Sequence, residues 1–183
     1  MFKQTSFEAV TVQDIATAAE FGKGTIYQFF DSKEEILIYI ICQAMDALCD
    51  DIETQCLQEV DVTVGVSRFI ALNYRFYLEN SNLFLSLLRR RLKGSIKPEW
   101  TAEMRPRRHK KMELVARLLE RGIAEKIIIP SDSHELARFL ENMVKGFSLE
   151  VMENRSNDFD PQKDLELISR ILSDGIVYRK GEK

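Results

Sequence analysis

Residues 23–28, Lys-Gly-Thr-Ile-Tyr-Gln, combine side chains that can contact both the backbone and the bases of a nucleic acid. Lys23, Thr25 and Tyr27 can each donate a hydrogen bond to a phosphate oxygen, a contact that fixes position without reading sequence. Gln28 can present its amide in bidentate fashion to an adenine edge. Gly24 has no side chain, so a helix that carries it can approach a groove closely. The run therefore predicts a short helix whose polar face reads DNA.

Two short helices joined by a tight turn are expected to position that polar face. Thr11 is a suitable N-cap for the first helix, and Asp14 follows at the spacing of a capping box. The second helix is predicted from about Lys23 to Phe30, with Ile26 facing inward. Phe21, in the turn, is expected to fill the space between the two helices. This order is that of a helix-turn-helix, which places its second helix in the DNA major groove.

A third helix is predicted to begin directly after the second. Ser32 can cap its first turn, and Glu35 completes the Ser-x-x-Glu pattern of a capping box. Lys33, near the start of this helix, can reach a phosphate oxygen of bound DNA. The helical pattern then continues to about Gln58.

The residues that carry this pattern are Thr11-Val12, Asp14-Ile15-Ala16, Ala18-Ala19, Lys23-Gly24-Thr25-Ile26-Tyr27, Phe30 and Ser32-Lys33-Glu34-Glu35. Together they resemble the N-terminal signature of the tetracycline-repressor (TetR) family of bacterial transcription regulators. The rest of the chain is similar to that family only in length and expected helical layout. The resemblance implies that Gln28 lies where bases are read. It also implies that the phosphate backbone is anchored by Thr11, Lys23, Thr25, Tyr27 and Lys33.

Three departures from the family pattern stand out. The family usually has Gly at the position of Glu20, so this chain has a carboxylate near the interhelical turn. It usually has Ser or Thr at the position of Gly22, and the lost capping hydroxyl costs at most a few tenths of a kcal/mol. Only Met1 to Ser6 precede Phe7, so we expect the family's first helix to be truncated here or to lie upstream.

The composition favours an almost wholly α-helical, soluble protein, with 45% hydrophobic residues and four prolines in 183 residues. No apolar run is long enough to span a bilayer and no signal peptide is seen, which predicts a cytoplasmic location. We expect a helix-turn-helix DNA-binding domain over residues 1–45 and a larger helical effector-binding and dimerisation domain over residues 46–183. The formal net charge of −3, and the acidic excess within residues 1–34, lack the usual basic footprint of a DNA-binding domain.

The last two long helices, predicted near residues 131–153 and 161–177, are amphipathic. The family resemblance implies that they pair with their copies in a second subunit, so that two reading helices lie about 34 Å apart on DNA. The alternative is that these faces fill the core of a monomer. The candidate interface residues are Leu136, Phe139, Leu140, Met143, Gly146, Phe147, Leu165, Ile168, Ile171, Leu172 and Gly175.

The family resemblance also implies an effector pocket among the middle helices. Aromatic and Met side chains are frequent there, which favours a small and largely apolar effector. The alternative is that side chains at this helical spacing form ordinary core. The candidate lining residues are Phe69, Leu72, Asn73, Phe76, Phe84, Leu87, Leu88, Trp100, Met104 and Met112.

Residues 89–111 hold ten lysines and arginines against only Glu99 and Glu103. The simplest interpretation of this basic run is a solvated helix face. Two functional interpretations stay open, namely an anionic effector such as a phosphate-bearing acyl thioester, and a second contact with DNA phosphates.

Cys42, Cys49 and Cys56 are spaced seven residues apart, near a common stripe of one helix. Such residues lie about 10 Å apart along the helix axis, whereas a disulfide needs Cα atoms within roughly 7 Å. We interpret the cysteines as small buried side chains, with a thiol sensor or an intersubunit bridge as the alternative.

The chain offers little for catalysis. His109 and His134 lie in different predicted helices without a nearby cluster of metal ligands, and neither a Gly-rich phosphate loop nor a Gly-x-Ser-x-Gly elbow occurs. We therefore expect no catalytic residues, no metal and no cofactor.

The sequence thus predicts a ligand-responsive DNA-binding transcriptional regulator whose partners are a double-stranded DNA operator, a small-molecule effector and a second copy of the chain. Release of a repressor by its effector is the favoured mode, and activation stays open. The alternative is a dimeric helical small-molecule-binding protein with a degenerate DNA-binding head.

Overall fold

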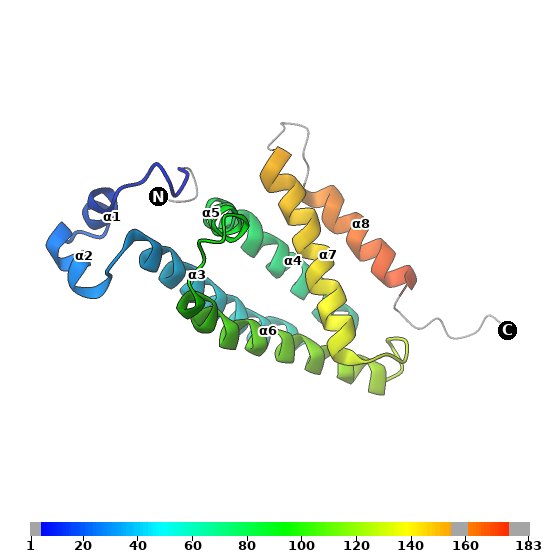
Figure 1. Ribbon diagram of the computed structural model, residues 1–183. Coiled ribbons are helices and arrows are strands. Elements are labelled where there is room, and N and C mark those ends of the chain that lie inside the picture. Colours follow the sequence, from blue (N-terminus) through cyan, green and yellow to red (C-terminus); the bar gives the residue numbers. More distant parts are fainter. Residues whose placement is uncertain (1–4, 155–160, 176–183) are drawn as a thin grey trace. The chain divides into compact units, whose positions relative to one another are not determined.

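The computed structural model describes residues 5–154 and 161–175, and every element within those ranges is a helix (Figure 1). The elements are α1 (Val12–Ala18), α2 (Lys23–Phe29), α3 (Lys33–Asp51), the π-helical turn η1 (Ile52–Cys56), α4 (Val62–Glu79), α5 (Ser81–Leu92), α6 (Pro98–Ala124), α7 (Ser133–Asn154) and α8 (Pro161–Gly175). The predicted all-α fold with an N-terminal helix-turn-helix and a larger helical part is confirmed. None of these helices combines the length and apolarity needed to cross a membrane.

The helices form two compact units. The first unit contains Met1–Asp46 and Glu79–Arg107, and the second contains Ala47–Leu78 and Arg108–Lys183. The first segment of the first unit ends at Asp46, and the sequence predicts a domain boundary after residue 45. Residues 79–107, however, group with the helix-turn-helix, whereas the sequence assigns them to the larger domain.

A buried cluster explains why residues 79–107 belong to the first unit. Trp100 of α6 is 6% exposed and packs against Ile38 and Cys42 of α3. Leu87 of α5 and Met104 of α6 pack at the margin of this cluster. Burial of a large indole is one of the stronger apolar contacts that a small unit can make. The cluster around Trp100 therefore packs α5 and the beginning of α6 against α3.

A second apolar cluster holds α1 and α2 against the start of α3. Its buried members are Val12 and Ala16 of α1, Ile26 of α2 and Ile36 of α3. Two-turn helices are not stable in isolation, because nucleation is unfavourable and few hydrogen bonds follow it. This cluster therefore gives the two short helices their fixed positions.

The predicted capping box of α1 is complete, whereas at α3 the Ser32 cap is present and the Glu35 carboxylate accepts from Asp31 instead of Ser32. The backbone N–H and the hydroxyl of Thr11 donate to the Asp14 carboxylate at 2.8 and 2.7 Å, and the Asp14 N–H donates to the Thr11 hydroxyl oxygen at 3.2 Å. At the start of α3, the Glu35 N–H donates to the Ser32 hydroxyl oxygen at 3.2 Å, and the Glu35 carboxylate accepts from the Asp31 N–H at 2.7 Å. These bonds satisfy backbone donors that a helix start leaves without intrahelical partners.

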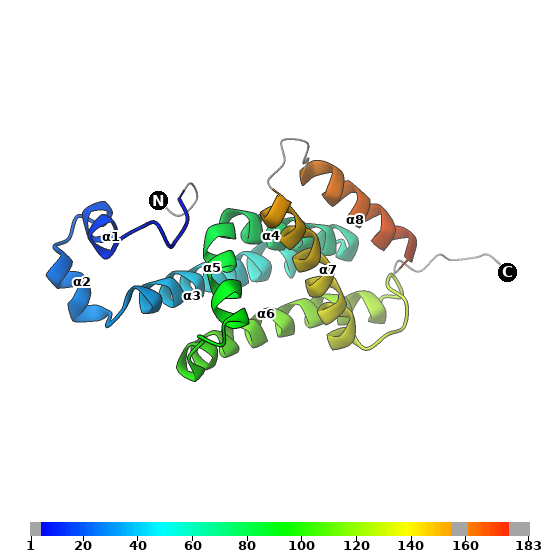
Figure 2. The same ribbon diagram turned by 45° about the horizontal axis from the view of Figure 1, so that its top comes forward.

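In the second unit, α4, α7, α8 and the later part of α6 lie together (Figure 2). Large apolar side chains from these helices are buried and form the core of the unit. Gly65 lets α4 pass close to η1, since a Cβ there would lie 2.9 Å from the carbonyl oxygen of Cys56. The core residues that are at most 1% exposed include Phe69, Ile70, Leu118, Leu119, Leu140 and Ile168.

A polar network crosses this second unit. The Lys111 ammonium of α6, a residue 4% exposed, donates to Glu141 of α7 at 2.7 Å and to the side-chain oxygen of Asn73 of α4 at 3.2 Å. Glu141 also accepts from the Tyr77 hydroxyl and from the Asn73 side-chain amide, each at 2.7 Å. Each buried charge therefore has an opposite charge and hydrogen-bond partners, which is what makes its burial tolerable. The network ties three helices together.

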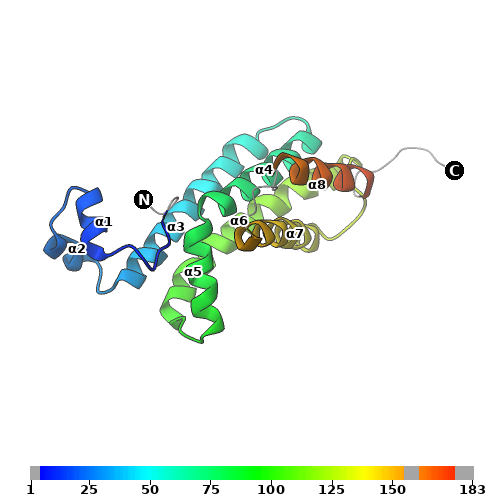
Figure 3. The same ribbon diagram turned by 90° about the horizontal axis from the view of Figure 1, so that it is seen from above.

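Helices α7 and α8 lie side by side (Figures 1 and 3). The Tyr74 hydroxyl of α4 donates to the Asp164 carboxylate of α8 at 2.9 Å, which links α8 to the rest of its unit.

The candidate interface residues on α7 and α8 face in different directions. Leu136, Leu140 and Ile168 are buried in the interior of their own chain. Phe139 and Ile171 are 56% and 53% exposed. Gly146 is exposed, and the half-buried residues are Met143, Phe147 and Leu165. The side chains of Leu172 and Gly175 lie outside the described residues.

Candidate nucleic-acid interface

Helix α2 presents its predicted reading residues to solvent. Ile26 is 8% exposed and faces the cluster formed with α1 and α3, which turns the opposite side of the helix outward. The Lys23 ammonium lies 5.9 Å from the centroid of the Tyr27 ring. Thr25 is half-buried, and the exposed residues are Lys23, Gly24, Tyr27 and Gln28. One helix face thus combines a cation, a phenol and an amide, the groups that contact phosphates and base edges.

The turn between α1 and α2 contains a residue in the left-handed region. Glu20 has a φ of 59°, and the next residue, Phe21, closes the turn by donating its N–H to the carbonyl oxygen of Ala16 at 2.9 Å. A residue with a Cβ pays about 1 kcal/mol in this conformation, whereas Gly adopts it freely. The turn therefore favours the Gly that the family usually has at this position.

Phe21 does not fill the space between the two helices. Its ring is 59% exposed, so that expectation is wrong. The space is occupied by Ala16 and Ile26 themselves, which are 0% and 8% exposed and belong to one cluster.

Two of the predicted phosphate anchors already have partners within the chain. The Thr11 hydroxyl belongs to the capping box of α1. The Lys33 ammonium donates to the carbonyl oxygen of Glu8 at 3.2 Å and lies 4.5 Å from the centroid of the buried Phe7 ring. These residues could contact DNA only by sharing or breaking those interactions. Of the predicted anchors, Lys23 and Tyr27 lie on the exposed face of α2.

Much of the basic run over residues 89–111 is neutralised by nearby carboxylates. Arg107 pairs with Asp46 at 2.9 Å, and Lys111 pairs with Glu141 at 2.7 Å. Three further pairs are Arg89–Glu8 at 3.7 Å, Arg90–Glu34 at 3.1 Å and Lys110–Asp50 at 3.3 Å. Several of these cations therefore fix local structure, and the run offers a weaker positive surface than its sequence suggests.

The candidate effector-pocket residues fall into two local groups. Phe69, Leu72, Asn73, Phe76 and Met112 belong to the second unit, where Asn73 takes part in the Lys111–Glu141 network. Phe84, Leu87, Leu88, Trp100 and Met104 belong to the first unit. The sequence did not separate the two groups, because periodicity shows which side chains are buried but not in which cluster.

All three cysteines are free and buried, which confirms their interpretation as small buried side chains. Burial raises the pKa of the Cys56 thiol to about 11, an effect that Asp51 reinforces and Arg68 opposes. Burial likewise raises the pKa of Cys42. A buried thiol that stays protonated is a poor nucleophile, so the geometry argues against a thiol sensor.

The two histidines converge on one carboxylate. His134 Nε2 lies 3.0 Å from Glu113 Oε1, and His109 Nδ1 lies 3.9 Å from the same atom. The spacing of His109 and Glu113, four residues apart on a helix, could have indicated the contact between those two side chains. Among the described residues, no three His, Cys, Asp or Glu side chains come together as metal ligands do.

Solved structures share this fold over nearly the whole chain. A candidate fatty acid metabolism regulator from Clostridium perfringens is 26% identical with a TM-score of 0.69, and the match covers 97% of this chain and 95% of that one. The TetR-family transcriptional regulator PfmR from Thermus thermophilus is 24% identical with a TM-score of 0.72, over 95% and 93% of the two chains. A candidate regulator from Saccharomonospora viridis, solved with choline, is 16% identical with a TM-score of 0.81, over 97% and 92%.

A scan of family models adds direct evidence from sequence. Residues 1–40 match the model described as bacterial regulatory proteins, tetR family, and this range contains α1, α2 and the start of α3. No curated protein matches the chain. Residues 1–40 thus carry the N-terminal sequence of the tetR family of bacterial regulatory proteins, and the described chain shares the helical fold of solved TetR-family transcriptional regulators.

Proposed function

We propose that this chain binds an operator as a homodimer and represses transcription until a small, largely apolar or anionic effector releases it. The observation that carries the proposal is the exposed polar face of α2, held in place by the buried contacts of Ile26. Sequence reading needs side chains on a rigid element, free to enter the major groove. The burial of Ile26 and the exposure of Lys23, Tyr27 and Gln28 on α2 support the proposal.

The DNA-binding part is tested by fluorescence anisotropy with the DNA that flanks the gene. We expect Gln28→Ala to relax discrimination between operator and scrambled DNA, since a lost bidentate base contact is worth about 1–3 kcal/mol. Gln43→Ala, an exposed glutamine on α3, is the matched control and should leave the discrimination unchanged. Equal affinity of the unaltered chain for operator and scrambled DNA would end the proposal.

The dimer is proposed to form through the exposed parts of α7 and α8. Phe139 and Ile171 are large apolar side chains with more than half of their surface in solvent, and Gly146 leaves room for a second helix. Phe139→Arg should shift the sedimenting species from dimer to monomer. Arg138→Ala, at the exposed neighbouring position, should leave the dimer intact. A chain that sediments as a monomer at all concentrations would contradict this part.

Release by an effector requires a ligand that binds the two subunit arrangements with different affinity. The structural relatives bear names that mention choline, fatty acid metabolism and ketosteroids, so their effector chemistries differ. The aromatic side chains of this chain favour an apolar molecule. Decanoate, an apolar anion, is the first probe, and it should lower the affinity of the chain for operator DNA. Undiminished binding at saturating decanoate would remove apolar anions from the proposal.

A second candidate is a dimeric small-molecule binder whose DNA-binding head is degenerate. The observation that favours it is the engagement of Thr11 and Lys33 by other residues of the chain. Under this alternative the chain would bind operator DNA no more tightly than scrambled DNA, while still forming a dimer.

A further inference from the structure

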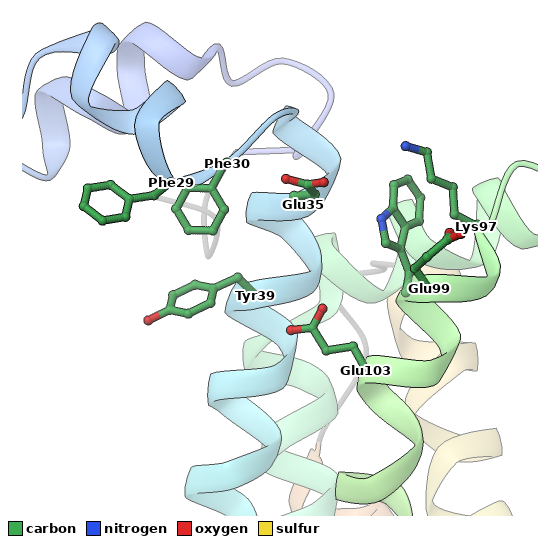
Figure 4. A pocket seen from close by; sticks show the side chains of 8 residues that line it. Phe29, Phe30, Glu35, Tyr39, Lys97, Glu99 and Glu103 are labelled. Carbon is green, nitrogen blue, oxygen red and sulfur yellow. The ribbon is translucent and has the colours of Figure 1, made fainter.

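A hollow of about 330 Å³ opens in the first unit between α3 and α6, beside the end of α2 (Figure 4). This volume lies at the lower end of the range of sites for small organic molecules. It is lined by side chains of α2, of the residue that follows it, of α3 and of the beginning of α6. The hollow lies outside the core of the second unit, so it is distinct from any effector pocket there.

Four of its eight lining residues are aromatic. Phe29, Phe30 and Tyr39 gather on the side of α2 and α3 (Figure 4). Trp100 of α6 also lines the hollow. The rings of Phe30 and Tyr39 meet edge to face, with centroids 5.4 Å apart. Phe29 is 75% exposed and Tyr39 is 46% exposed, although aromatic side chains are normally covered. Exposed rings beside a hollow are a surface for an apolar group to cover.

The charged groups of the hollow are mostly negative. Glu35, Glu99 and Glu103 line it together with a single cation, Lys97. The Glu103 carboxylate reaches from α6 towards α3 (Figure 4). Glu99 and Glu103 are exposed and four residues apart, so they lie on the same face of α6. An anion would meet three carboxylates here, whereas a cation would be attracted.

One cation of the chain already lies over an aromatic ring of the hollow. The Lys97 ammonium lies 5.4 Å from the centroid of the Trp100 ring, within the distance at which the face of an indole attracts a positive charge. The hollow therefore combines ring faces with an excess of carboxylates. That combination suits a cation carried on an apolar body, and quaternary ammonium groups are bound in this way in aromatic cages.

We propose that this aromatic and carboxylate-lined hollow binds a small organic cation of the aryl- or alkylammonium class. The rings cover the apolar body, and Glu99 and Glu103 neutralise the charge. Because Phe29 is the last residue of α2, a bound cation would touch the end of the reading helix. This consequence for DNA rests on the proposed function, whereas the binding itself does not.

Trp100 gives this site its own reporter, since it is the only tryptophan in the sequence. The full chain is titrated with benzyltrimethylammonium and the tryptophan emission is recorded. We expect a saturable change with this cation and none with benzenesulfonate or benzyl alcohol at equal concentrations. No saturable change, or the same change with all three probes, would overturn the proposal. The measurement uses no DNA, so its outcome and that of the operator assay are independent.

Charge variants sharpen the test. Glu99→Gln and Glu103→Gln should each weaken binding by about 2- to 5-fold, as expected for partly exposed charge pairs. Lys97→Gln should strengthen it, because the competing cation is removed. Glu20→Gln makes the same charge change at an exposed position outside the hollow and should leave the affinity unchanged. An unchanged emission spectrum of the unliganded Glu99→Gln and Glu103→Gln variants verifies that Trp100 keeps its surroundings. Equal affinities for Glu103→Gln and Glu20→Gln would contradict the assignment.

Discussion

The Lys33 ammonium lies 4.5 Å from the centroid of the Phe7 ring and donates a hydrogen bond to the carbonyl oxygen of Glu8. Phe7 is fully buried, so Lys33 covers a core side chain with its charged end. The family resemblance implies that the same lysine contacts a DNA phosphate. Its structural role has to be separated from any role in binding.

Lys33→Ala should reduce both stability and DNA affinity, whereas Lys23→Ala should reduce DNA affinity alone. The loss of the Phe7 contact is worth about 0.5–1 kcal/mol, the range of partly exposed cation–π pairs. Lys23 is exposed on α2, and surface substitutions usually change stability by less than about 0.5 kcal/mol. Urea unfolding and the salt dependence of operator binding measure the two effects. Equal unfolding midpoints for Lys33→Ala and the unaltered chain would show that the Phe7 contact contributes nothing.

Glu20→Gly should stabilise the helix-turn-helix. Glu20 has a φ of 59°, and replacing it removes the Cβ penalty, partly offset by the greater freedom of Gly in the unfolded chain. We expect a net gain of about 0.5–1 kcal/mol in urea unfolding. Ala19→Gly is the neighbouring control, and it should destabilise because Ala19 has a φ of −90°. A loss of stability in both variants would contradict strain at Glu20.

The sequence predicts the local features of the helix-turn-helix well. Capping residues mark the starts of α1 and α3, and the spacing of Ile26 relative to the polar residues of α2 correctly orients that helix. These features depend on residues three or four positions apart, which lie close together in any helix. The sequence placed the Glu20 carboxylate near the turn but did not predict the left-handed backbone of that residue, which only the structure shows.

Long-range contacts could not be predicted in this way. Lys111 and Glu141 are on different helices, and Trp100 reaches Ile38 across more than sixty residues of sequence. Periodicity shows that such side chains are buried but not which partners they meet. The aromatic hollow escaped prediction for the same reason, because its lining comes from two stretches that lie far apart in the chain, residues 29–39 and 97–103.

The pair formed by Lys111 and Glu141 should make stability depend on acidity. Burial by itself raises the pKa of Glu141, but the Lys111 charge and the hydrogen bonds from Lys111, Tyr77 and Asn73 outweigh it, so the pKa lies below its ordinary value of 4.5. A carboxylate whose pKa is lowered by folding contributes stability that is complete above its ordinary pKa. This contribution is lost as the pH falls through the folded-state pKa. Urea unfolding should therefore show decreasing stability below about pH 4.5.

Glu141→Gln tests the origin of that dependence. Removing the charge leaves Lys111 buried without its ion-pair partner, which should cost about 3 kcal/mol at neutral pH. The variant should also lose less stability than the unaltered chain between about pH 5 and 3.5, a range that includes the ordinary carboxyl pKa. Glu166→Gln, on the exposed side of α8, is the control and should alter neither property. Parallel pH profiles for Glu141→Gln and the unaltered chain would remove Glu141 as the source.

The three cysteines should resist alkylation in the folded chain. With the pKa of Cys56 raised to about 11, roughly one Cys56 side chain in a thousand is a thiolate at pH 8, and its burial blocks reagents as well. Iodoacetamide followed by mass spectrometry should find the thiols unmodified in buffer and all of them modified in urea. Cys49→Ser serves as a control that assigns the labelled positions. Rapid modification of one thiol in buffer would restore the interpretation as a thiol sensor, because only an accessible thiolate reacts quickly.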